Sequence, residues 1–148
     1  MSKTRLDFLK YAFPSLELQF NEDYSEAVIL NPNYDENITV YDDDFQFTVC
    51  FSFQHCHFED EGDVIDWIRK IISGNAFVIE FFKNSQRGFG SEIDAEDLQD
   101  LSYEKLELFT GYYGLTKLQD VADLFKIRGW DSKNNFDYTI TCDAMGVS

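Results

Sequence analysis

The chain has 148 residues, of which 44% are hydrophobic and 17% aromatic, and it carries 28 acidic against 12 basic side chains. A chain of this length can bury a core, and this content of core-forming residues argues against disorder. The net charge of −16 repels nucleic acid and anionic membranes and attracts cationic partners. We therefore predict one globular domain, residues 1–148, that binds neither nucleic acid nor membranes; acidity that serves only solubility remains the alternative.

Two features predict a cytoplasmic protein. The N-terminal stretch MSKTRLDFLKYAF has its apolar run interrupted by Asp7 and Lys10, so it is typical of neither a secretion signal nor a membrane span. The three cysteines are odd in number and lie in mixed settings, which fits reduced thiols better than a disulfide framework.

The first half of the chain predicts a short helix followed by a strand meander. Apolar residues at helical spacing indicate a helix over residues 3–13, which Pro14 ends. Alternating apolar and polar residues then predict four strands, over residues 16–20, 26–30, 37–41 and 45–53. The last of these has the clearest pattern, with one face made of Phe45, Phe47, Val49, Phe51 and Phe53.

The second half mixes helices and strands. An apolar stripe predicts a helix ending near residue 72, and its members are Val64, Ile65, Ile68, Ile71 and Ile72. A strand over 76–83, a turn over 86–90 and short helical turns within 92–115 follow. A helix from Thr116 with Phe125 on its buried face, and a strand over 136–143, complete the chain. This order predicts an α+β fold, a mostly antiparallel sheet of about six strands with two or three helices packed on it.

The stretch CFSFQHCHFEDE, residues 50–61, contains both histidines and two of the three cysteines. On a strand, His55 and His57 point the same way, and such a pair can chelate zinc or copper. They also continue the register of the fourth strand, which places them at the end of its core face and puts Cys50 and Cys56 on the opposite face. We favour the core interpretation, with a metal site as the weaker alternative.

No catalytic signature stands out elsewhere. GFG at 88–90 lacks the rest of a phosphate-binding fingerprint and is interpreted as a turn. Carboxylates are so abundant that pairing two of them as acid and base carries little information. We therefore predict no catalytic residue and no cofactor.

The acidic residues are concentrated in the first half of the chain, where no Lys or Arg occurs from Tyr11 to Ile68. The candidate partner-binding residues are those around the fourth strand, together with one aromatic anchor: Asp42, Asp43, Asp44, Glu59, Asp60, Glu61, Asp63 and Trp130. Covering the edge of the core is the alternative role for the Trp130 ring. Along one continuous strand, the two acidic groups would lie about 45 Å apart at ~3.3 Å per residue, which predicts two separate patches.

Four phrases resemble a known kind of protein: VCFSFQHCHFEDEGDVIDWIRKII, FVIEFFKNSQRGFGSEI, FTGYYGL and FKIRGWDSKNNFD. Together they span roughly residues 45–143, about two-thirds of the chain, and are similar to small acidic immunity proteins found beside bacterial polymorphic toxins. The resemblance implies a cytoplasmic inhibitor that binds a cognate toxin domain and has no enzymatic activity. Two alternatives remain open: a metal-binding protein or enzyme that uses His55 and His57, and a general acidic interaction domain.

Overall fold

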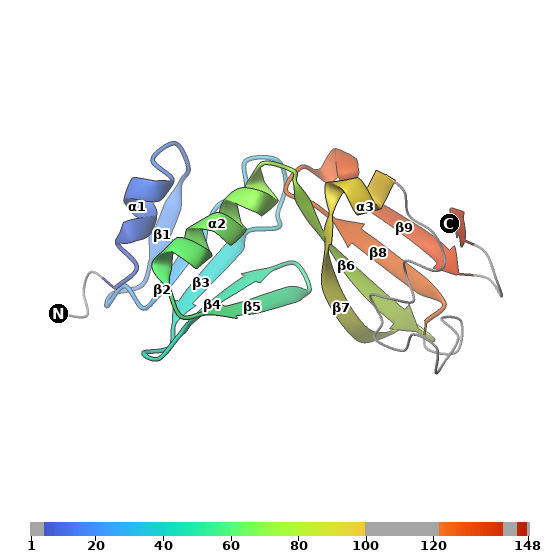
Figure 1. Cartoon of the computed structure of the whole chain (residues 1–148), viewed down its shortest axis with the longest axis horizontal. Helices are drawn as coiled ribbons and strands as arrows, with labels where there is room; N and C mark the ends of the chain where they lie inside the picture. Colours follow the sequence, from blue (N-terminus) through green and yellow to red (C-terminus); the bar gives the residue numbers. More distant parts are fainter. Residues whose placement is uncertain (1–4, 100–121, 141–144, 148) are drawn as a thin grey trace. The chain divides into compact units, whose positions relative to one another are not determined.

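A computed structural model of the chain describes residues 5–99, 122–140 and 145–147. Contacts within the chain group it into two compact units, Met1–Ser73 and Gly74–Ser148. Each unit has its own sheet (Figure 1). The single domain over 1–148 stays a prediction, and the two units are described separately below.

The first unit is a five-stranded antiparallel meander in which each strand pairs with the next along the chain. Helix α1, Phe8–Ala12, is shorter than predicted and precedes the sheet. The strands are β1 (Leu18–Phe20), β2 (Glu26–Ile29), β3 (Ile38–Asp42), β4 (Phe47–Phe51) and β5 (Gln54–Phe58). Helix α2, Glu61–Ile72, follows and contacts β4 and β5. We call the five-stranded sheet β1–β5 sheet A.

The core of the first unit lies between one face of sheet A and the helices. Alternate strand residues on that face are fully buried: Ala27, Ile29, Ile38, Val40, Val49 and Phe51. Helix α2 buries Val64, Trp67, Ile68 and Ile71. The predicted apolar stripe is thus confirmed at three of its five positions, and Trp67 completes it through a ring contact with Phe58.

The second unit holds five antiparallel strands in the order β10-β9-β8-β6-β7. They are β6 (Ala76–Lys83), β7 (Gln86–Asp94), β8 (Leu124–Arg128), β9 (Phe136–Ile140) and β10 (Met145–Val147). Short helix α3, Ala95–Gln99, follows β7, and a 3-10 turn, Ser132–Asn134, lies between β8 and β9. The core cluster consists of Phe77, Ile79, Phe81, Ile93, Ala122, Phe125, Ile127 and Ile140.

The α+β class with antiparallel pairing is confirmed, although the strands form two sheets of five and not one sheet of about six. Two local predictions in the second unit are wrong. The segment around Phe125 is strand β8, not the end of a helix, and residues 86–90 open β7. The chain instead turns at Asn84 and Ser85, whose φ angles of 51° and 67° match a tight hairpin.

Several predicted features, including the phrase FTGYYGL and the start of the helix at Thr116, lie outside the described residues. Within the described ranges, no helix is long and apolar enough to cross a membrane.

Candidate functional site

The stretch CFSFQHCHFEDE folds as a hairpin, so the prediction of one strand running through it is wrong. Strand β4 ends at Phe51, and β5 begins at Gln54, which pairs directly with Phe51. Ser52 makes the turn with a φ of 54°, in the left-handed region. The sequence gives little warning of this turn, because Ser52 and Phe53 include neither Gly nor Asn, the residues that normally mark a two-residue hairpin.

The hairpin reverses the predicted faces of the histidines. Directly paired residues share a face of the sheet, and the register pairs Cys50 with His55 and Thr48 with His57. Both histidines are exposed and lie opposite the buried face that holds Val49. The core interpretation of the histidines is therefore wrong. Cys50 lies on the face opposite Val49 and Phe51, as predicted, but the prediction that it lies opposite the histidines is wrong, because it shares their face.

The geometry offers little support for a metal centre at the histidines. Their ring centroids are 5.3 Å apart, but no group of three or more metal-ligating side chains occurs among the described residues. Burial, together with the negative charge of Asp43, raises the pKa of the Cys50 thiol. A raised pKa keeps this thiol protonated, which disfavours it as a metal ligand or nucleophile.

His57 is held in a short hydrogen-bonded chain. Its Nδ1 lies 3.0 Å from Thr48 Oγ1 and 3.1 Å from Gln46 Nε2, and the Thr48 hydroxyl donates to Asp43 Oδ2 at 2.6 Å. When Nδ1 is unprotonated, it accepts from Gln46 Nε2; because Thr48 gives its only proton to Asp43, the Thr48 oxygen accepts from Nδ1 when Nδ1 is protonated instead. These hydrogen bonds connect the exposed face of β4 and β5 to Asp43 in the β3–β4 turn.

The same hairpin brings the predicted acidic residues together. Asp42, Phe47 and Phe58 occupy neighbouring positions on β3, β4 and β5, so the outer two are separated by two strand spacings, about 10 Å. The β3–β4 turn and the β5–α2 connection consequently lie at the same end of sheet A. The prediction of two patches about 45 Å apart is therefore wrong.

The β1–β2 turn adds further carboxylates at this end, because the amide of Asp42 donates to the carbonyl of Ser25 at 2.8 Å. We call this set of carboxylates the acidic end; its members are Glu22, Asp23, Asp42, Asp43, Asp44, Glu59, Asp60, Glu61 and Asp63. Asp42 has a structural role. Arg5 donates to its carboxylate from Nε at 2.8 Å and also lies 2.7 Å from Asp44. The Arg5 hydrogen bond lowers the pKa of Asp42.

Asp60 also has a structural role, as the N-cap of α2. Its Oδ1 accepts from the Gly62 amide at 2.5 Å, and Glu61 and Asp63 occupy the first turn, where the helix dipole favours negative charge.

Substitution Asp60→Ala is expected to lower the free energy of unfolding by about 1 kcal/mol, because an unpaired amide is left at the start of α2. Chemical denaturation followed by circular dichroism measures this. Glu59→Ala is the matched control, because Glu59 carries the adjacent carboxylate in the chain but does not cap the helix. Equal losses in both variants would contradict a capping role for Asp60.

Phe45 is the most exposed aromatic residue at the acidic end among those the structure describes. It was predicted to lie on a core face, but its side chain is 94% exposed in the β3–β4 turn. Asp44 has a φ of 72°, and the Asp43 amide donates to the Gln46 carbonyl at 2.9 Å, which closes the turn and pushes the ring outward. Trp130, the predicted anchor, is only 6% exposed in the second unit. Sequence reasoning therefore missed Phe45, because the alternation of β4 runs on into the turn.

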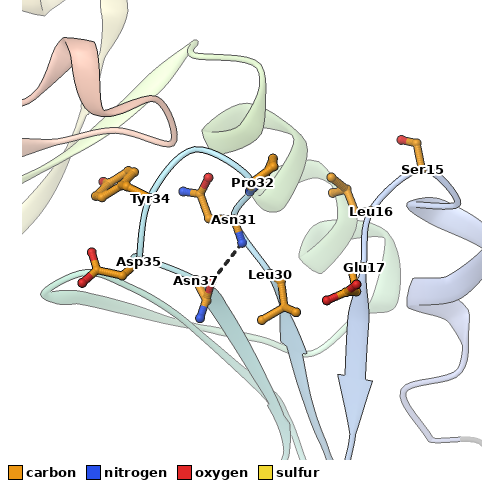
Figure 2. Close-up of a pocket in the computed structure, with 9 residues that line it drawn as sticks. All are labelled: Ser15, Leu16, Glu17, Leu30, Asn31, Pro32, Tyr34, Asp35 and Asn37. Carbon is orange, nitrogen blue, oxygen red and sulfur yellow. Dashed lines mark hydrogen bonds between the residues drawn. The ribbon is translucent and has the colours of Figure 1, made fainter.

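A pocket of about 520 Å³ lies at the opposite end of sheet A (Figure 2). One side is the segment leading into β1, Ser15 to Glu17, and the other is the β2–β3 loop. The remaining lining residues are Leu30, Asn31, Pro32, Tyr34, Asp35 and Asn37. None of these residues was predicted to belong to a functional site.

Comparison of the chain with known protein families, with curated proteins and with solved structures gave no match. The function must therefore be argued from the geometry and charge of the first unit.

Proposed function

We propose that this protein is an immunity protein, a cytoplasmic, non-enzymatic inhibitor that binds a cognate toxin domain with a cationic surface, such as a nuclease. The observation that carries the proposal is the acidic end of sheet A, where carboxylates from three connections lie at the same end of the sheet as the exposed ring of Phe45.

The charge of this surface suits a nuclease-like partner. An enzyme that cleaves nucleic acid needs a basic cleft for the phosphate backbone, and a cluster of carboxylates can occupy that cleft in its place. Glu22, Glu59 and Glu61 are exposed, so long-range attraction would speed the encounter.

Charge alone gives fast association but not a long-lived complex. Interfaces usually gain most of their affinity from a few aromatic or arginine residues that become desolvated, ringed by polar contacts. Phe45, flanked by Asp43, Asp44 and Gln46, has that composition. In this proposal, the turn carries the anchor and the carboxylates around it steer the partner.

The test is inhibition of the toxin domain encoded by the adjacent reading frame. Co-expression is expected to restore growth, and the purified protein to abolish toxin activity at one equivalent. The association rate is expected to fall steeply as salt is added, because exposed charges are screened over ~10 Å at 0.1 M. A toxin that stays fully active in excess protein would refute the proposal.

A further inference from the structure

The pocket in Figure 2 has walls whose backbone is fixed by hydrogen bonds, one between the two sides and two within the β2–β3 loop. The Leu30 amide donates to the Glu17 carbonyl at 2.9 Å, which ties the segment before β1 to the end of β2. In the loop, the Asn31 amide donates to Asn37 Oδ1 at 2.9 Å, and Asn31 Nδ2 donates to the Glu36 carbonyl at 2.9 Å. The pocket is therefore preformed, and its volume falls within the range of ligand-binding clefts, ~300–1,000 Å³.

The lining combines an apolar surface with negative charge. Leu16, Leu30 and Pro32 provide the apolar part. Glu17 and Asp35 are exposed, and neither carboxylate forms a hydrogen bond or ion pair within the described part of the chain. No Lys or Arg occurs from Tyr11 to Ile68, so the segments that line the pocket contain no cationic side chain of their own.

We propose that this pocket binds the side chain of an arginine presented by a peptide segment. The two carboxylates exclude an anion, and a purely apolar ligand would gain nothing from them. An arginine satisfies both parts of the lining, because its aliphatic stem can cover Leu16 and Leu30 while its guanidinium meets a carboxylate.

Arginine suits the pocket better than lysine. The guanidinium is planar, is less strongly hydrated than an ammonium, and can donate two parallel hydrogen bonds to one carboxylate. It also stacks on aromatic rings, and Tyr34 lines the same pocket.

This inference goes beyond the proposed inhibition of a toxin. The pocket lies at the end of sheet A opposite the acidic end and shares no residue with it. Arginine binding by the pocket and inhibition of a toxin can therefore fail independently, and the pocket is tested on the isolated full-length protein.

The experiment is an NMR titration of the full-length protein with N-acetyl-arginine amide, monitored by backbone amide shifts. Saturable shifts are expected at Leu16, Glu17, Leu30 and Asn37. The citrulline analogue, which has the same shape without the charge, is expected to cause none. Glu17→Gln or Asp35→Asn, whichever removes the carboxylate that meets the guanidinium, should weaken binding about tenfold, the effect of one charge-assisted hydrogen bond.

Glu22→Gln is the control, since Glu22 is an exposed carboxylate of the same unit at the other end of sheet A. It should leave the affinity unchanged. The same titration is run with the lysine analogue, which should bind more weakly. The proposal would be overturned by equal shifts with citrulline, by equal affinity for lysine, by shifts only at the acidic end, or by the absence of a saturable shift. The amide spectra of the variants also show whether each one is folded.

Discussion

Substitution Phe45→Ala is expected to weaken the complex with the toxin domain by about 2 kcal/mol, roughly a 30-fold rise in Kd. The ring is 94% exposed, so it contributes almost nothing to the core of the first unit. The free energy of unfolding should therefore stay within ~0.5 kcal/mol of the unsubstituted protein. Titration calorimetry and denaturation measure the two quantities separately.

The matched control for Phe45 is Tyr11→Ala. Tyr11 is also an exposed aromatic residue of the first unit, at 80%, but it belongs to α1 and not to the β3–β4 turn. Its loss should leave Kd unchanged. The Phe45 effect should appear mainly as faster dissociation, whereas screening of the carboxylates slows association. A Phe45→Ala variant that binds as tightly as the unsubstituted protein would show that the acidic end is not the docking surface.

Strands β2 and β3 of sheet A could be predicted because their alternation has a physical cause. Ala27 and Ile29 on β2, and Ile38 and Val40 on β3, face the core, and the residues between them are less buried. The turns between these strands contain Asn, Pro and Asp, which favour reversal of the chain. Because the alternation and the turn residues agree there, the predicted ends of β2 and β3 lie close to the observed ends.

The β4–β5 hairpin could not be predicted for the opposite reason. From Phe45 to His57 the alternation continues unbroken, although residues at both ends of β4 lie in turns. Ser52 adopts a positive φ without the local advantage that Gly or Asn would have. Tertiary packing sets the register at this point, and an error of one turn reverses the face of every residue that follows it.

The β4–β5 turn also determines how much of the candidate site can be predicted from the sequence. The carboxylates could be identified from composition alone, because their positions in connections follow from their polarity. Their gathering at one end depends on β5 running antiparallel to β4. The exposure of Phe45 depends on where the β3–β4 turn ends, which alternation does not show.

The helix expected around Phe125 illustrates a different ambiguity. Ala122 and Phe125 are both buried and three residues apart, a spacing typical of a helix. Phe125 and Ile127 are also both buried, with half-buried residues on either side, which is the period of a strand. Short apolar segments satisfy both periods, and pairing with β6 decides in favour of the strand.

The second large effect is expected in the second unit, at Gly90. Gly90 on β7 pairs directly with Glu80 on β6, and the Glu80 side chain is fully buried. A Cβ at residue 90 would collide with Glu80 Oε2 and would lie 3.2 Å from the Ile79 carbonyl oxygen. The φ of Gly90 is not positive, so the glycine is required for space and not for backbone conformation.

Glu80 cannot easily move to make room. Its Oε1 is paired with Arg87, while Oε2 accepts no hydrogen bond from any described residue. Burial raises the pKa of Glu80, and the Arg87 hydrogen bond only partly opposes it. A carboxyl whose folded pKa is raised makes the protein more stable as pH falls through that pKa toward its ordinary value of 4.5. Glu80→Gln is expected to remove this part of the pH dependence.

Gly90→Ala is therefore expected to lower the free energy of unfolding by about 3 kcal/mol at neutral pH, at the upper end of overpacking costs. Urea denaturation measures it. Gly88→Ala is the control on the same strand: its Cβ would meet only the Phe81 carbonyl at 3.5 Å, an ordinary contact.

The double variant Glu80→Ala, Gly90→Ala separates the carboxylate from the strand itself. If the collision with Glu80 is the cause, the double variant should be clearly more stable than the sum of the two single losses predicts, because the second substitution removes the obstructing group. Strict additivity would place the cost at the Ile79 carbonyl and not at the buried carboxylate. Measuring the free energy of unfolding of Glu80→Ala and of Gly90→Ala across the acidic pH range then shows whether the stability lost in Gly90→Ala depends on the charge of Glu80 or only on its volume.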